Sequence, residues 1–268
     1  MTVTVRYGVL ADVHANLFAL RAAIERLRRE GVDAWLCAGD LVGYGPQPNE
    51  CVEAVAELDA VCVAGNHELI LLGRLSEQRS GRLARQTIAW TRGVLRDDCR
   101  AFLEGLPTVA TAPSLVVGHG SLDDAEEYVL HDAQAARQLR RLEVDHPAAS
   151  MLVLGHTHRP WVYHQRDGAL PPAGAHALPA GRVLLNPGSV GQSRQAERIP
   201  RARFMLLDLE RRQARQLATT YDVAACRQVL RQHALPGDAI HLRPGRLARA
   251  RRRARGLLTY RGSRPWVP

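Results

Sequence analysis

Several short apolar runs, the pattern of buried β-strands, end in Gly or Ala and continue directly into Asp, Asn or His. The clearest run covers residues 151–154 and leads through Gly155 to His156 and His158. Side chains two positions apart in a strand point to the same side, so both imidazoles are expected to reach one small volume. There they can bind one metal ion or two adjacent ions. The same succession of residue types recurs at residues 9–14, 36–40, 61–67 and 115–119.

Segments with a helical pattern lie between the first three of these apolar runs. A strand predicted over residues 3–11 is followed by Asn16, a good helix N-cap, and by apolar positions with helical spacing that end at Gly31. Further strands are predicted at 34–38 and 60–64, with a short helix at 49–57 between them. Alternating strands and helices favour parallel pairing with right-handed crossovers. In such sheets ligands collect beyond the carboxyl ends of the strands, which is where the Asp, Asn and His residues lie.

Residues 69–106 show a helical pattern with an arginine-rich polar face, which Pro107 ends. The inward-facing candidates of this helical insert are Ile88, Trp90, Leu95 and Phe102. The insert is either a lid over the site or a pair of packing helices that do not contact the substrate.

The second half of the chain alternates short apolar runs with turns. A strand at 114–117 and a helix at 132–142 precede the 151–154 run, and the Gly- and Pro-rich stretch 167–181 is predicted to be a loop. Parallel units first and antiparallel strands later predict an α/β fold with two packed, mixed β-sheets flanked by helices. The later strands are predicted at 161–164, 183–185, 204–209 and 215–220.

The composition is that of an ordinary globular protein. The chain has 268 residues, of which 46% are hydrophobic and 24% charged, and this favours one domain with decorations. No apolar run approaches the roughly 20 residues of a membrane span, and the N-terminus lacks a signal-peptide pattern. We therefore expect a cytoplasmic protein without a membrane partner. The five Cys residues are scattered singly, which favours reduced core thiols.

The net charge of +9 is concentrated at the C-terminus. All 36 basic residues are Arg, and nine of them lie within residues 241–268, where there is no acidic residue. The rest of the chain is neutral, so only this basic tail supports binding to nucleic acid. A solvated terminal helix is one alternative. Docking of the tail on the body, or on a second subunit of a homo-oligomer, is another.

The strand ends supply eight candidate metal ligands, which are carboxylate, amide or imidazole groups without a thiolate. Such sets suit Mn, Fe, Zn, Ni or Co better than Ca or a structural Zn ion. Eight groups are too many for one catalytic ion that keeps an open position. They suit two ions about 3.5–4 Å apart, bridged by a carboxylate, which activate water and stabilise a phosphoryl transition state. The candidates are Asp12, His14, Asp40, Asn66, His67, His119, His156 and His158.

Five ordered motifs resemble those of the calcineurin-like metallophosphoesterases. They are Asp12-Val13-His14, Gly39-Asp40, Gly65-Asn66-His67-Glu68, Gly118-His119 and Gly155-His156-Thr157-His158. Residues 43–46 and 186–191 further resemble the small bacterial and archaeal phosphodiesterase branch. The resemblance covers about residues 4–235 and implies a four-layer α/β/β/α sandwich. We therefore expect a metallophosphoesterase domain at 1–235, with the insert at 69–106 and a basic C-terminal extension at 236–268.

The resemblance also implies which residues bind two divalent transition-metal ions. Mn is the foremost candidate, and Fe, Ni, Zn, Co and Mg are alternatives. Asp40, whose carboxylate has two oxygens, would bridge the ions. The other implied ligands form two groups of three, Asp12, His14 and His158 for one metal and Asn66, His119 and His156 for the other.

The resemblance further implies how a phosphoester substrate is bound and cleaved. A hydroxide between the metals would attack in line, while His67 would contact the phosphate and protonate the leaving oxygen. Asn66 would bind through a neutral carbonyl oxygen and also contact the substrate. Arg194 is a further candidate for a phosphate contact, although the abundance of Arg favours a solvated side chain. Asp123 and Asp124 are interpreted as helix or turn caps.

Several functions are compatible with these motifs. The leading hypothesis is a metal-dependent phosphoesterase that hydrolyses a small phosphodiester or phosphomonoester. A diadenosine tetraphosphate hydrolase, a serine/threonine protein phosphatase and a nuclease would share the metals and the water, because their selective groups lie on loops. A non-catalytic interaction module of the same fold is the hypothesis from another class. The intact ligand set and His67 argue against such a module, since a scaffold has no physical need for them.

Overall fold

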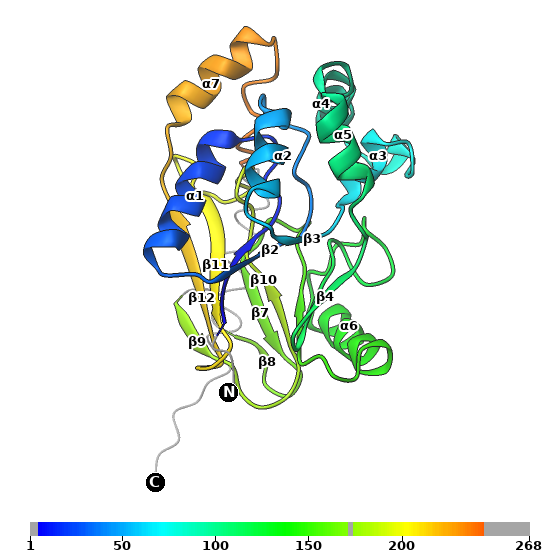
Figure 1. Ribbon diagram of the computed structural model, residues 1–268, viewed down its shortest axis with the longest axis vertical. Helices are drawn as coiled ribbons and strands as arrows, with labels where there is room; N and C mark the ends of the chain where they lie inside the picture. The colour runs from blue at the N-terminus through cyan, green and yellow to red at the C-terminus, as the bar shows by residue number, and fades with distance from the viewer. Residues whose placement is uncertain (1–4, 171–173, 244–268) are drawn as a thin grey trace.

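The strands form two six-stranded mixed sheets that pack against each other (Figure 1). The structure is a computed structural model that describes residues 5–170 and 174–243. The first sheet has the order β3 (Val61–Cys62), β2 (Ala34–Cys37), β1 (Arg6–Leu10), β11 (Ala202–Asp208), β12 (Gln213–Thr219) and β9 (Ala175–Ala177). The second has the order β4 (Ala110–Ala112), β5 (Leu115–Val117), β6 (Met151–Val153), β10 (Val183–Asn186), β7 (Trp161–His164) and β8 (Gly168–Ala169).

Helices cover the outer faces of both sheets. α1 (Leu17–Arg29) and α2 (Pro48–Ala56) pack on the first sheet around Phe204, and α6 (Asp132–Asp145) packs on the second around Leu152. Apolar side chains of β1, β6, β10 and β11 fill the space between the sheets. Figure 1 shows the resulting order of layers, from α1 through the two sheets to α6. The predicted α/β sandwich of two mixed sheets is therefore confirmed.

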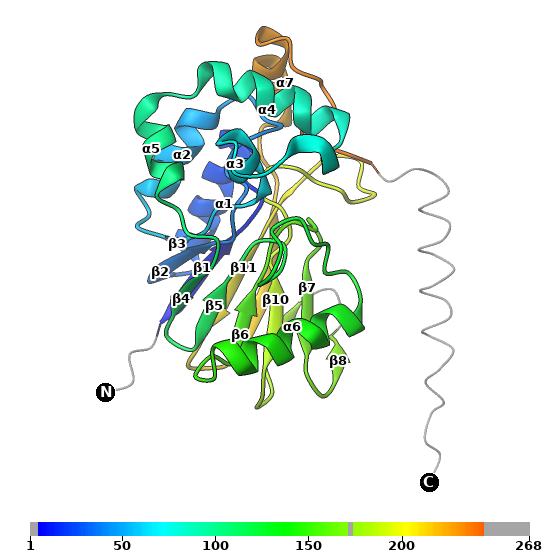
Figure 2. The ribbon, with the colours of Figure 1, turned by 90° about the vertical axis from the view of Figure 1, so that its right-hand side faces the viewer.

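Each sheet contains three parallel strands whose carboxyl ends lead towards the same region. These strands are β1, β2 and β3 in the first sheet and β5, β6 and β10 in the second. The late strands β11 and β12 join the first sheet through antiparallel pairing with β1, so early and late strands share a sheet. Figure 2 shows α3 (Asn66–Leu71) and α4 (Arg82–Val94) beyond the ends of β5 and β6.

The helical insert contains more elements than its pattern indicated. A 3-10 helix (Glu77–Arg79) precedes α4, and α5 (Asp97–Glu104) follows it. α3 begins at Asn66, inside one of the five motifs, because the chain turns directly from β3 into a helix there. Two of the four inward-facing candidates, Ile88 and Leu95, are buried, and the other two are partly buried.

Four elements were not predicted. The stretch 167–181, expected to be a loop, contains β8 and β9, and residues 171–173 within it lie outside the described part of the chain. β4 and α7 (Val223–Gln232) were also missed. Strands of two or three residues show no measurable periodicity. They exist because neighbouring strands supply the partners for their backbone hydrogen bonds.

The packed chain continues past the expected boundary at residue 235. Ala239 and Ile240 are fully buried, and the Leu242 N–H donates to the Ser193 carbonyl at 2.9 Å. The rest of the predicted basic extension, residues 244–268, lies outside the described residues. All five cysteines are free and buried, as expected. No helix in the described part of the chain is both long and apolar enough to span a membrane.

Candidate metal centre

Loops from both sheets and the first turn of α3 meet where the parallel strands end, and they carry all the predicted ligands. The ligands from the first sheet follow β1, β2 and β3, and those from the second follow β5 and β6. Three overlapping groups of side chains each have ligand atoms within 4.8 Å of one another. The groups are Asp12 with His14 and His158, His14 with Asp40 and His67, and Asp40 with His119 and His156.

The first cluster consists of Asp12, His14 and His158, whose side chains are fully buried. His14 Nε2 lies 3.1 Å from His158 Nε2, which in turn lies 3.5 Å from Asp12 Oδ1. The Nδ1 atoms of the two histidines bind the backbone carbonyls of Val42 at 3.2 Å and Gln192 at 2.8 Å. Because a carbonyl oxygen only accepts hydrogen bonds, each Nδ1 carries the proton and each Nε2 presents a lone pair.

These facing lone pairs fit a bound cation. Burial holds the pKa of His14 and that of His158 well below the usual value, so neither ring readily gains a second proton. Asp12 Oδ2 is buried without a hydrogen-bond partner, and burial raises the pKa of this carboxyl to about 7. A divalent cation between the three groups would satisfy both the lone pairs and the carboxylate. The residue types therefore fit a transition-metal site.

The second cluster places His119, Asn66 and His156 around Asp40. His119 Nε2 lies 3.2 Å from Asp40 Oδ2 and 3.1 Å from Asn66 Oδ1, while its Nδ1 donates to the Ala38 carbonyl at 2.6 Å. Burial opposes charge on this ring, but the Asp40 carboxylate outweighs burial and raises the pKa of His119 to about 10. The ring thus holds an extra proton at the position where the oxygens converge. A metal ion at that position would replace the proton.

Asp40 lies between the two clusters. Its Oδ2 is 3.2 Å from His119 Nε2, 3.7 Å from His14 Nε2 and 4.0 Å from His67 Nε2. Burial disfavours charge on Asp40, yet these imidazoles hold the pKa of its carboxyl well below the usual value. Its other oxygen, Oδ1, accepts a hydrogen bond from the backbone N–H of His67 at 2.9 Å, which fixes the orientation of the carboxylate.

Five of the predicted ligands have a left-handed backbone conformation. In residues other than glycine this conformation costs about 1–2 kcal/mol each and concentrates at functional sites. The expectation that strand alternation brings His156 and His158 to the same side is corrected here. Strand β6 ends before these residues, and their rings enter different clusters. The φ angles are 52° at Asp12, 48° at His14, 55° at Asp40, 62° at His156 and 56° at His158.

Two motif glycines leave space for the clustered side chains. A Cβ atom on Gly65 would overlap the Asp40 carboxylate, and one on Gly43 would overlap the His67 ring. Gly43 also has a φ of 78°, which a residue with a side chain rarely adopts. Glycine is therefore required at both positions.

Glu68 and Asn186 hold the ligand loops in place. A carboxylate oxygen of Glu68 accepts the backbone N–H groups of Asp40 at 2.9 Å and Gly65 at 2.8 Å. Asn186 Nδ2 donates to the Gly155 carbonyl at 2.7 Å, directly before the histidine-bearing loop. These contacts explain physically why Glu68 and the 186–191 segment accompany the ligand motifs.

His67 and Tyr44 form one wall of the centre. Burial lowers the pKa of His67, and its Nδ1 is buried without a hydrogen-bond partner. The Tyr44 ring lies 4.7 Å from the ring of His67 and 4.7 Å from that of His14, measured between centroids. The Tyr44 N–H donates to Thr87 Oγ1 at 3.0 Å, so α4 of the insert supports this wall.

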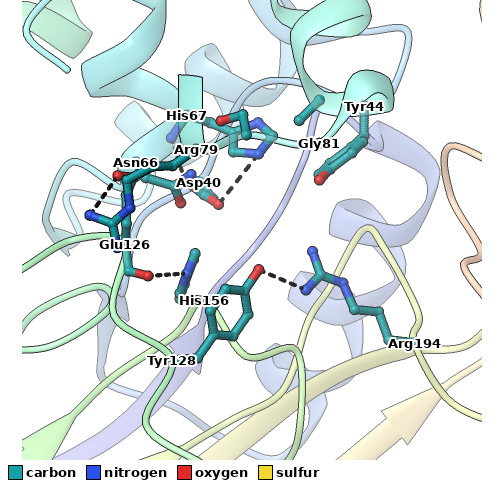
Figure 3. Close-up of a pocket in the computed structure, with 12 residues that line it drawn as sticks. Asp40, Tyr44, Asn66, His67, Arg79, Gly81, Glu126, Tyr128, His156 and Arg194 are labelled. Carbon is teal, nitrogen blue, oxygen red and sulfur yellow. Dashed lines mark hydrogen bonds and ion pairs between the residues drawn. The ribbon is translucent and has the colours of Figure 1, made fainter. Parts of the chain in front are cut away.

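A cavity of about 180 Å³ lies over Asp40, Asn66, His67 and His156 (Figure 3). Arg194 lines it together with Tyr128, whose hydroxyl accepts the Arg194 Nη1–H at 3.3 Å. The sequence favoured a solvated Arg194, whereas in the structure this side chain is partly buried and lines the cavity.

Other residues of the cavity wall had no signal in the sequence. Tyr128 and Glu126 come from the loop after β5, and Arg79 comes from the insert. They are ordinary surface residue types outside any motif, so only the folded chain brings them to the cavity.

The remaining polar candidates lie outside the three groups. Asp124 Oδ1 accepts the Glu126 N–H at 2.8 Å, which is the turn cap that was expected. Asp123 lies 3.6 Å from Arg141 in an ion pair. The histidines outside the groups are His131, His146, His164, His176, His233 and His241.

Residues 5–212 match the calcineurin-like phosphoesterase superfamily domain. The match covers the second sheet, the first sheet except β12, and all the clustered Asp, Asn and His side chains. The chain therefore belongs to the calcineurin-like phosphoesterase superfamily, as its five motifs predicted.

Relatives of the chain come from bacteria and archaea. A metallophosphoesterase from Sphaerobacter thermophilus is 31% identical and has a similar crystal structure, with a TM-score of 0.76 over 88% of this chain and 97% of that one. An uncharacterised protein of Methanocaldococcus jannaschii is 28% identical over 236 residues, which are 85% of this chain and 93% of the relative. A hypothetical protein of Pyrococcus horikoshii OT3 shares the fold at 21% identity, with a TM-score of 0.72 over 88% and 96% of the two chains.

Proposed function

We propose that this protein hydrolyses phosphoesters with two divalent transition-metal ions bound at the adjacent clusters. The observation that carries the proposal is the position of Asp40, whose Oδ2 lies 3.7 Å from His14 of one cluster and 3.2 Å from His119 of the other. Membership of the phosphoesterase family supports this chemistry. Bound metals would supply an activated water and positive charge that stabilises a phosphoryl transition state.

The ligands divide between two positions. Asp40 would contact both ions, and Asn66 would bind through its neutral carbonyl oxygen, which adds no negative charge to oppose an anionic substrate. Mn is the first candidate for the ions. The remaining ligands are Asp12, His14 and His158 at one position and His119 and His156 at the other.

Three side chains would act on the substrate itself. His67 would protonate the leaving oxygen through Nε2, the nitrogen that faces the site 4.0 Å from Asp40. Asn66 would contact the phosphate, because it also lines the cavity. Arg194 would bind a non-bridging phosphate oxygen, since its partly buried guanidinium lines the cavity.

The proposal is tested by measuring bound metal and hydrolysis of p-nitrophenyl phosphoesters together. We expect about two equivalents of metal per chain. A chelator should abolish hydrolysis, and Mn²⁺ should restore it. The exposed histidine His233 belongs to none of the three groups. The variant His233→Ala is therefore the control for substitutions of the clustered histidines, and it should keep its metal and its activity. Full activity in protein that has been stripped of metal would overturn the proposal.

A non-catalytic interaction module has no specific observation in its favour. The same experiment separates the two hypotheses, because such a module would bind metal without hydrolysing any of the p-nitrophenyl phosphoesters.

A further inference from the structure

An ion pair lies at one side of the cavity rim. Arg79, at the end of the 3-10 helix of the insert, places Nη1 3.1 Å from Glu126 Oε2 and 3.3 Å from Asp124 Oδ2. The two acids lie on the loop after β5, and Glu126 lines the cavity beside Arg79. Figure 3 shows the Arg79 and Glu126 side chains at one side of the cavity and the Tyr128 and Arg194 side chains at another.

The cavity is small, and its two arginine side chains differ in whether a carboxylate offsets their charge. Its volume of about 180 Å³ is below the roughly 300–1,000 Å³ that is typical of pockets for larger ligands. Arg79 is neutralised by two carboxylates, whereas Arg194 has no ion-pair partner within the described residues. Arg194 is partly buried, and its charge has no carboxylate partner among these residues, so it is suited to one anionic group of a ligand.

Glu126 adds a repulsive element. Its side chain is only 7% exposed at the cavity rim, and its backbone carbonyl is bound to His156 Nε2 at 3.2 Å. A second phosphate of a polyphosphate chain would therefore meet an Arg79 charge that two carboxylates already offset, instead of a free cation.

We propose that the substrate is a compact ester of a single phosphate, and that the Arg79–Glu126 pair is the element that excludes bulky and polyphosphate esters. This inference rests on the proposed function and narrows its substrate class. It places dinucleoside polyphosphates and other nucleotide esters among the excluded substrates.

Two diesters with the same leaving group test the selectivity. Methyl p-nitrophenyl phosphate and the p-nitrophenyl ester of thymidine 5′-monophosphate each carry one negative charge and differ mainly in bulk. With the Mn²⁺-loaded enzyme, kcat/KM should be about tenfold higher for the methyl ester. A dinucleoside tetraphosphate should be hydrolysed more slowly than either.

Variants at Arg79 test whether the Arg79–Glu126 pair causes the preference for the methyl ester. Arg79→Gln should lower the preference for the methyl ester about fivefold, mainly by lowering KM for the thymidine ester, because an exposed ion pair contributes little energy. Arg79→Lys should retain most of the preference. Arg82→Gln, an exchange at an exposed position outside the cavity wall, should leave it unchanged. High salt should weaken the preference in the wild type and leave Arg79→Gln unaffected.

The possible failures are distinguishable. Hydrolysis of both diesters with equal kcat/KM in the wild type, or an unchanged preference in Arg79→Gln with full metal content, would overturn this inference alone. Absence of hydrolysis of every ester by metal-loaded wild type would overturn the proposed function with it.

Discussion

The floor of the cavity and its mouth are built in contrasting ways. On the floor the side chains are buried, with Asp40 only 2% exposed, and their loops are held by buried hydrogen bonds. At the mouth, Arg79 is 63% exposed and meets its partners on another loop. Buried polar groups are costly unless each is satisfied, so the floor is restricted to one arrangement, whereas an exposed pair opens with little energy. We therefore expect substitutions on the floor to change catalysis and substitutions at the mouth to change substrate selectivity.

The largest effect is expected from the floor, in Asp40→Asn. A neutral amide bridges two cations poorly, so metal should be lost from both positions and kcat/KM should fall by about a thousandfold or more. Elemental analysis and kinetics check this result. His14→Ala, which removes a ligand of one cluster, should mainly loosen one ion. Full metal content in Asp40→Asn would contradict the bridging role.

His67→Ala should separate metal binding from proton transfer. Metal content should be unchanged, while kcat for an ester with a poor leaving group should fall about a hundredfold. The loss should be smaller for p-nitrophenyl esters, because an acidic phenol needs less protonation as it leaves. Equal losses for good and poor leaving groups would show that His67 only positions the phosphate.

Arg194→Gln tests the cavity wall between floor and mouth. Loss of a charge-assisted hydrogen bond to phosphate should raise KM about tenfold, with metal content retained. The exposed Arg198 provides the control Arg198→Gln. An unchanged KM would mean that Arg194 does not contact the substrate.

The smallest effect is expected from deleting the residues beyond Arg243. None of the predicted ligands lies in this basic tail, so activity on a small diester should stay within about threefold of the full-length protein. A truncated protein that keeps its metals and fold but loses most activity would show that the tail contributes to the site.

Most of the long elements were predictable because their patterns are local, although the ten-residue helix α7 was missed. α1 was recognised from its Asn16 cap and apolar spacing, and Asn16 Oδ1 does accept the Ala19 N–H at 3.1 Å. β8 and β9 were missed because two or three residues carry no period, and their backbone groups pair with strands distant in sequence. The ordered motifs likewise identified the ligand candidates, which the fold brings into overlapping groups.

By itself, the sequence determined the family, the two mixed sheets and the ligand candidates, since residue type and order along the chain are enough to define them. The resemblance had already assigned His156 and His158 to different metals, but only the tertiary structure shows how they reach different clusters, because left-handed backbone beyond β6 replaces the alternation of a strand. The tertiary structure also decided that Arg194 lines the cavity and that Arg79 meets Glu126 at the cavity rim. Such contacts join loops far apart in sequence, and no local pattern encodes the distance between them.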